Sequence, residues 1–101
     1  DEFEKNDKYV VFSGIGNHQT FISMLKKYGL NILKEFEFPD HYKYTKRDIN
    51  EILLEANNLK CKILTTEKDY LRLNTENLSQ IKFIKSELKI IDEEKFLKSL
   101  L

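Results

Sequence analysis

The chain has 101 residues, of which 41% are hydrophobic and 34% are charged, which suits one modest folded domain and excludes a disordered segment. Its 17 basic residues balance its 17 acidic residues. This balance argues against a nucleic-acid partner, because nucleic-acid binders usually gather a basic excess on one face. No apolar run approaches the roughly 20 residues of a membrane-spanning helix.

The single cysteine and the N-terminal segment bear on the cellular compartment. Cys61 excludes an internal disulfide and a cysteine-based zinc cluster, and a free thiol fits a reducing cytosol. Residues 1–8 are charged, have no apolar stretch of the kind a signal peptide needs, and are expected to be a linker remnant. The chain has no initial Met and enters a strand directly after this segment. We therefore expect residues 9–101 to be the C-terminal domain of a larger protein.

The first predicted strand, residues 9–12, is a continuous apolar run, typical of a strand covered on both faces. Gly14 and Gly16 interrupt this run, and the side chain of Asn17 is a candidate N-cap for a helix. Gly29 supplies the helix stop. Between these signals, apolar residues recur at helical spacing: Phe21, Ile22, Leu25 and Tyr28.

Residues 30–38 return to strand character. Strict alternation places Ile32, Phe36 and Phe38 on one face and Leu33 on the other. Charged residues are interspersed among these, and they predict a strand at or near a sheet edge. Pro39 ends the strand because it has no N–H for the ladder.

The clearest predicted helix follows this second strand. Thr45 and Asp48 have the spacing of a capping box, with Asp in place of the usual Glu or Gln. An apolar stripe at positions i, i+3, i+4 and i+7 then marks one face of the helix: Ile49, Ile52, Leu53 and Ala56.

Residues 61–64 form a short third predicted strand. Thr66 can cap a short helix in which Glu67 and Asp69 complement the positive end of the dipole, and Lys68 is solvated. Its inward residues are expected to be Tyr70, Leu71 and Leu73. Residues 74–80 are predicted to be loop, 81–84 a fourth strand, and 88–91 an extension of it or a fifth strand. Asp92 is expected to cap a terminal helix carrying Phe96, Leu97, Leu100 and Leu101.

This alternation of strands and helix-length connections predicts an α/β fold: a small, mainly parallel sheet flanked by helices, in a Rossmann-like sandwich. The carboxyl ends of parallel strands meet at one edge of the sheet, where open α/β sheets bind ligands. Three polar segments, residues 14–17, 38–41 and 65–69, follow the first three predicted strands. We therefore expect them to form one functional surface.

Gly14 and Gly16 lie between a strand and a helix, as in the phosphate-binding turn of dinucleotide folds. Gln19 occupies the position of the third glycine. A tight turn followed by a helix N-cap is therefore the preferred interpretation, although the helix N-terminus keeps the capacity to accept an anion.

Asp40 and His41 follow the strand-ending proline. Histidine exchanges protons near neutral pH, with an ordinary pKa of about 6.5, and a neighbouring carboxylate can fix its tautomer. Composition alone favours a loop histidine packed among Phe38, Tyr42 and Tyr44. The other histidine, in the first turn of the first helix, has no evident partner. The sequence contains no HExxH motif, P-loop or nucleophile elbow.

Several segments of the chain together match a known family: residues 10–17, Phe21, residues 38–42, Tyr44, Thr45, Asp48 and residues 64–69. Taken in register, they resemble the C-terminal domain of the tetraacyldisaccharide 4′-kinase family, the lipid A biosynthesis kinases of Gram-negative bacteria. His18 stands where a proline is common in the family, and this departure concerns only a structural preference at the first helical position.

The resemblance implies a two-domain enzyme whose N-terminal domain carries a P-loop that binds ATP and Mg²⁺. It implies phosphate transfer to the 4′-hydroxyl of a lipid-linked glucosamine disaccharide, tetraacyldisaccharide 1-phosphate, which gives lipid IVA. The reaction would take place at the cytoplasmic face of the bacterial inner membrane, with the enzyme bound peripherally. This chain alone would be inactive and would hold no cofactor or metal.

The resemblance also assigns roles to residues. His41 would assist a catalytic aspartate in the other domain, and Asp40 would orient His41. Two alternatives remain from the residues alone: a non-catalytic α/β module that binds a protein partner or small anion at the strand carboxyl edge, and a stand-alone nucleotide-binding domain. The expected cleft or interdomain residues are Gly14, Gly16, Asn17, Tyr42, Thr66, Glu67, Lys68 and Asp69.

Overall fold

The computed structural model describes residues 7–73 and 78–84. Within them, four strands form one parallel sheet in the order β2-β1-β3-β4, which confirms the predicted α/β fold. The strands are β1 (Lys8–Ser13), β2 (Asn31–Glu37), β3 (Lys62–Thr66) and β4 (Ile81–Ile84). The helices are α1 (His18–Lys27), α2 (Lys46–Leu59) and α3 (Glu67–Leu71), and a 3₁₀ turn (Leu78–Gln80) precedes β4.

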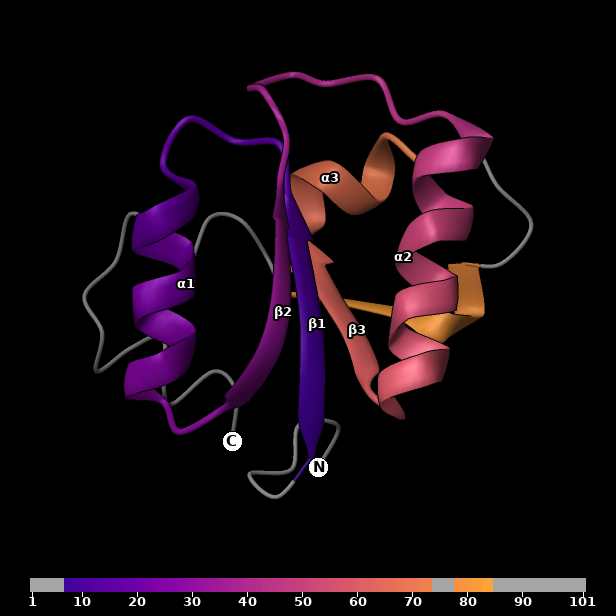
Figure 1. Ribbon diagram of the computed structural model, residues 1–101. Coiled ribbons are helices and arrows are strands. Elements are labelled where there is room, and N and C mark those ends of the chain that lie inside the picture. The colour runs from indigo at the N-terminus through magenta and orange to yellow at the C-terminus, as the bar shows by residue number, and fades with distance from the viewer. Residues whose placement is uncertain (1–6, 74–77, 85–101) are drawn as a thin grey trace.

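Helices α1 and α2 cover opposite faces of the sheet, which gives three layers (Figure 1). The strand order explains this arrangement. β2 lies on one side of β1 and β3 on the other, so two right-handed crossovers carry their helices to opposite faces. The core is therefore divided into two apolar clusters, one between the sheet and α1 and the other between the sheet and α2.

β1 is an interior strand of the described sheet, and its side chains enter both clusters. Tyr9 and Val11 pack in the α1 cluster, while Val10 and Phe12 pack in the α2 cluster. All four are fully buried, as the continuous apolar run predicts for a strand covered on both faces. β2 pairs only with β1 in the described sheet, so its predicted edge position is also confirmed.

The predicted faces of β2 are wrong at one point. Ile32 packs against the α1 cluster, whereas Phe36 packs against the α2 cluster. The register explains this, because Tyr9 faces Ile32 but Val10 faces Lys34, so β2 holds an extra residue there. Such an irregularity reverses the alternation of side chains, and spacing along one strand does not reveal it.

Local signals at the helix ends are mostly confirmed. Thr45 and Asp48 form both halves of the predicted capping box of α2. Gly29 follows α1 with a φ of 101°, a left-handed conformation that glycine adopts without penalty. Asn17 occupies the N-cap position of α1, but its side chain accepts no capping hydrogen bond, so that detail of the prediction is wrong.

Other expectations are corrected or fall outside the described residues. Leu71 was expected to face inward but is 76% exposed, because α3 has only five residues and packs through Tyr70 instead. β1 begins at Lys8, inside the expected linker. The rest of that linker to residue 6, residues 74–77 of the expected loop, the possible strand at 88–91 and the terminal helix after Asp92 lie outside the described residues.

Candidate functional site

The strand order reverses direction at β1, because β2 lies on one side of it and β3 and β4 on the other. The topological switch point therefore lies between β1 and β3. In open α/β sheets, ligands bind in the crevice outside the carboxyl ends of the strands at such a point. The residues that follow β1 and β3 are therefore the first candidates for a functional site.

The three polar segments converge at this position, as the sequence predicts. The backbone N–H of Phe38, after β2, donates to the carbonyl of Ser13 at 2.8 Å. The backbone N–H of His41 donates to the carbonyl of Gly14 at 3.1 Å. The segment after β2 therefore crosses the carboxyl end of β1 on its way to α2 (Figure 1).

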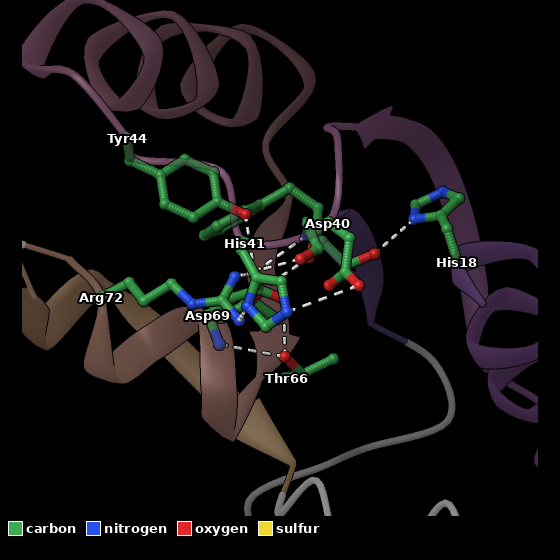
Figure 2. Close-up of polar contacts among 11 residues, drawn as sticks. His18, Asp40, His41, Tyr44, Thr66, Asp69 and Arg72 are labelled. Atoms are coloured by element: carbon green, nitrogen blue, oxygen red, sulfur yellow. Dashed lines mark hydrogen bonds and ion pairs between the residues drawn. The ribbon is translucent and has the colours of Figure 1, made fainter. Parts of the chain in front are cut away.

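Asp69 connects these segments. Its carboxylate is fully buried, and Oδ1 accepts hydrogen bonds from the Gly14 N–H and the Tyr44 hydroxyl, both at 2.9 Å. Oδ2 accepts from the Thr66 hydroxyl at 2.6 Å, and Arg72 Nη1 lies 3.4 Å from Oδ1. A buried carboxylate is stable only with such partners. We call these five residues the Asp69 cluster (Figure 2).

The short helix α3 delivers Asp69 to the switch point. Thr66 is its N-cap and accepts from the Asp69 N–H at 3.1 Å, while its hydroxyl proton goes to the carboxylate. The predicted cap at Thr66 is therefore confirmed. Burial and the neighbouring Asp69 carboxylate both raise the pKa of Tyr44, which keeps its hydroxyl protonated as a donor.

Gly14 is required by its surroundings. A Cβ at this position would lie 2.9 Å from the Pro39 carbonyl oxygen and 3.1 Å from the Tyr44 hydroxyl oxygen. At Gly16 the nearest atom, a carboxylate oxygen of Asp40, would be 3.6 Å away. Close approach of the loop after β2 thus explains the first glycine, which supports the tight turn over a dinucleotide-binding turn.

His41 lies at the outer rim of this arrangement. Its side chain is 81% exposed, so the interpretation of a histidine packed among aromatic rings is wrong. These aromatic rings pack against one another instead: Phe38 and Tyr42 are stacked with centroids 4.8 Å apart, and Tyr44 meets both edge-to-face at 5.1 and 5.3 Å. His41 has a φ of 61°, a left-handed conformation that is uncommon for residues other than glycine.

Two charged side chains flank the His41 ring (Figure 2). Nε2 lies 3.6 Å from Oδ2 of Asp40, and Nδ1 lies 3.4 Å from Nη2 of Arg72. Arg72 also donates from Nη1 to the Gly14 carbonyl at 3.0 Å. The exposed imidazole is thereby connected to the buried Asp69 cluster.

The remaining predicted site residues lie around this centre without joining it. The Tyr42 hydroxyl donates to Asp48 at 2.8 Å, and this bond raises the pKa of Tyr42. Asn17 and Lys68 are exposed, and Glu67 is half-buried. In the part of the chain that the structure describes, no hydrogen bond or ion pair connects these last three side chains to the Asp69 cluster.

His18 differs from its expectation, because it is buried and has two partners. Nδ1 is hydrogen-bonded to the Ser13 hydroxyl, and Nε2 lies 2.8 Å from a carboxylate oxygen of Glu35. Since a carboxylate only accepts, the ring donates from Nε2. His18 thus ties the start of α1 to β1 and β2, apart from the Asp69 cluster.

Sequence reasoning missed Arg72 as a site residue and used Tyr44 only as part of a motif. Arg72 stands three residues after Asp69, a spacing that places two side chains on one face of a helical turn. That spacing was the available signal for the Asp69–Arg72 ion pair. Tyr44 lies 25 residues from its acceptor Asp69, and no local pattern predicts such a contact.

Within the described residues, the candidate site provides an exposed imidazole that is connected through Arg72 to the buried Asp69 cluster, but it does not provide a complete set of catalytic groups. Among residues 7–73 and 78–84, no group of three or more His, Cys, Asp or Glu side chains is placed to hold a metal ion. In the same residues, no helix is long and apolar enough to cross a membrane.

Comparisons with known proteins agree with the resemblance. A family model described as Tetraacyldisaccharide-1-P 4'-kinase matches residues 1–101. The Tetraacyldisaccharide 4'-kinase of Pelagibacter ubique (strain HTCC1062) is 52% identical over 94 residues, which are 93% of this chain and 30% of that protein. The protein of the same name from Rickettsia bellii (strain OSU 85-389) is 43% identical over 72 residues, which are 71% of this chain and 22% of that protein.

A comparison with solved structures finds no match. The chain spans 30% or less of the length of these two curated relatives. The family match nevertheless extends over all 101 residues and includes every segment that meets at the switch point. The chain belongs to the tetraacyldisaccharide 4′-kinase family.

Proposed function

We propose that this chain is the C-terminal domain of a tetraacyldisaccharide 4′-kinase, and that the domain extends from the start of β1 at Lys8 to residue 101. The complete protein transfers phosphate from ATP to the 4′-hydroxyl of tetraacyldisaccharide 1-phosphate, which gives lipid IVA in lipid A biosynthesis. The observation that carries this proposal is the family match over residues 1–101, together with the accessible His41 at the topological switch point. Family membership does not favour the alternative of a non-catalytic binding module.

In this proposal, His41 assists a catalytic aspartate supplied by the N-terminal domain, and Asp40 helps to orient it. Phosphoryl transfer depends mainly on positioning and charge stabilisation, so a histidine that orients the base suits the reaction. Two observations support this role. The imidazole is exposed to a partner group, and its backbone N–H is fixed to the Gly14 carbonyl.

In the proposed enzyme, ATP and Mg²⁺ are bound mainly by the N-terminal P-loop domain. The sequence of this chain has no GxxxxGK[ST] motif, and among residues 7–73 and 78–84 no group of three or more His, Cys, Asp or Glu side chains is placed to hold a metal ion. We therefore assign no step of ATP binding to this chain. The exposed Gly16, Asn17 and Lys68, with the half-buried Tyr42 and Glu67, belong to the proposed cleft or interdomain surface. Gly14, Thr66 and Asp69, also expected there, are buried and would support that surface from inside the domain.

Because its acceptor is lipid-linked, we further propose that the complete enzyme binds peripherally at the cytoplasmic face of the bacterial inner membrane. The 101-residue chain, lacking the P-loop, is expected to transfer no phosphate by itself.

The test is a transfer assay with radiolabelled ATP, Mg²⁺ and tetraacyldisaccharide 1-phosphate. We expect the complete protein to label the disaccharide at the 4′ position and the 101-residue chain to give no product. Absence of labelling by the complete protein, under conditions in which the Pelagibacter ubique protein labels the acceptor, would refute the proposal.

A further inference from the structure

We infer that Arg72 is a positioning residue that fixes the tautomer and ring orientation of His41. The kinetic consequence of this inference rests on the proposed function, whereas the contact itself does not. No part of the family resemblance assigned a role to Arg72.

The guanidinium of Arg72 is held firmly on one side. Nη1 donates to the Gly14 carbonyl at 3.0 Å and lies 3.4 Å from Asp69 Oδ1. Asp69 is itself fully buried and fixed by the Gly14 N–H, the Tyr44 hydroxyl and the Thr66 hydroxyl. Only 24% of the Arg72 side chain is exposed. Its planar group therefore has little freedom to turn away from His41.

The chemistry of the two groups sets the direction of their contact. A guanidinium carries five N–H donors, has no acceptor and does not lose its proton in proteins. The 3.4 Å contact between Nη2 of Arg72 and Nδ1 of His41 can therefore run only from arginine to histidine. Nδ1 must present its lone pair, so the proton of the neutral ring lies on Nε2.

Asp40 favours the same tautomer of His41 through the other ring nitrogen, Nε2. Its Oδ2 lies 3.6 Å from Nε2, and a carboxylate favours a proton on the nitrogen that faces it. Asp40 is 52% exposed, however, so solvent screens this contact. Arg72 is the more deeply anchored neighbour, and we assign the orientation of the ring chiefly to it.

The carbonyl oxygen of Gly14 helps to hold both the backbone and the ring of His41 in place. The carbonyl oxygen of Gly14 accepts from the His41 N–H at 3.1 Å and from Arg72 Nη1 at 3.0 Å. A φ of 61° at His41 is maintained by the first bond, and the ring is aligned through the second. The result is an imidazole whose Nε2–H faces Asp40 and, because the side chain is exposed, can also donate to a carboxylate of the partner domain.

The decisive measurement is the protonation state of the two ring nitrogens of His41 in the complete protein labelled with ¹⁵N-histidine. Long-range proton–nitrogen correlations distinguish the two tautomers, and the spectrum of His41→Asn assigns the signals. We expect Nδ1 to be unprotonated and Nε2 to be protonated. A predominant Nδ1–H tautomer in the unmodified protein would overturn the inference.

The test variant is Arg72→Lys, which keeps the charge but replaces the planar fork, whose Nη1 contacts the Gly14 carbonyl and whose Nη2 contacts His41, with a single nitrogen. We expect the His41 ring in this variant to populate both tautomers. Arg47→Lys, at an exposed position in α2, is the matched control and should leave the His41 spectrum unchanged. Unchanged ring signals of the buried His18 in Arg72→Lys would show that the domain remains folded.

Kinetics then separate positioning from structure. Arg72→Lys should lower kcat by about 10- to 100-fold and change KM by less than about twofold, because it misplaces a group without removing substrate contacts. An unchanged His41 tautomer in this variant, or an unchanged kcat when His41→Ala is nearly inactive, contradicts the inference. Full activity of His41→Ala instead refutes the proposed role of His41, and the nitrogen spectrum then decides the Arg72 contact independently.

Discussion

The backbone N–H of Gly14 donates to Oδ1 of Asp69 at 2.9 Å, across 55 residues of sequence. This bond joins the carboxyl ends of β1 and β3 at the topological switch point of the sheet. The segment after β2 is attached to the same place, because the Gly14 carbonyl accepts from the His41 N–H. The buried contact between the residues that follow β1 and β3 thus supports the exposed His41, which follows β2.

Removal of the Asp69 carboxylate should destabilise the domain. Asp69→Ala leaves the Gly14 N–H and the Tyr44 hydroxyl without their acceptor, and it removes the negative charge beside the Arg72 guanidinium. Unsatisfied buried donors and an unpaired charge together should lower the free energy of unfolding by about 3 kcal/mol, measured by urea unfolding of the complete protein.

Two variants calibrate that experiment. Tyr44→Phe removes a single donor and should cost about 1 kcal/mol. Asp40→Ala alters a half-exposed carboxylate and should change the free energy of unfolding by less than about 0.5 kcal/mol. An Asp69→Ala variant as stable as Asp40→Ala would contradict the role assigned to the buried carboxylate.

The two glycines after β1 form a matched pair. Gly14→Ala places a Cβ 2.9 Å from the Pro39 carbonyl oxygen, so the loop after β2 must shift, at a cost of about 1–3 kcal/mol. Gly16→Ala meets its nearest atom at 3.6 Å and should be neutral or slightly stabilising. Thermal unfolding midpoints of the two variants compare them directly, and equal midpoints would argue against close packing at Gly14.

The role of the imidazole is tested by His41→Ala and His41→Asn. Asparagine tolerates the left-handed conformation found at this position, so it removes the imidazole with little change in the backbone. Both variants should lower kcat of the complete enzyme by about 100- to 10,000-fold, the usual contribution of acid–base assistance.

A neighbouring variant, Lys43→Ala, controls for general effects on this exposed loop and should retain normal turnover. Near-normal turnover in both histidine variants would mean that His41 is an ordinary surface residue.

Stability at low pH should report on Asp48. Burial acts to raise the pKa of this carboxyl, but hydrogen bonds from the Thr45 backbone and the Tyr42 hydroxyl outweigh it and lower the pKa. A lowered pKa in the folded state means that ionised Asp48 stabilises the protein at neutral pH. This contribution is lost as the pH falls below about 4 and through the folded-state value.

The corresponding measurement compares Asp48→Ala with the unmodified protein by urea unfolding at pH 7 and pH 3. The difference should be about 1 kcal/mol at pH 7, as for loss of a helix cap, and should shrink at pH 3. Glu51→Ala, at an exposed position of the same helix, is the matched control. A difference that is constant between the two pH values would contradict the assigned cause.

The sequence alone determined the features that depend on neighbouring residues. The apolar run of β1, the capping box at Thr45 and Asp48, and the stop at Gly29 follow from local spacing and backbone preference. Helix-length connections determined the parallel sheet, and parallel strands in turn brought the three polar segments to one edge.

Only the tertiary structure decided which side chains meet there. The irregularity in β2, the Ser13–His18–Glu35 contacts and the placement of Arg72 beside His41 each depend on residues brought together from separate elements. Periodicity records which face of its own element a residue occupies, but not which residue of another element lies opposite. Those pairings are fixed by the path of the whole chain, through register, crossover and the close approach of loops.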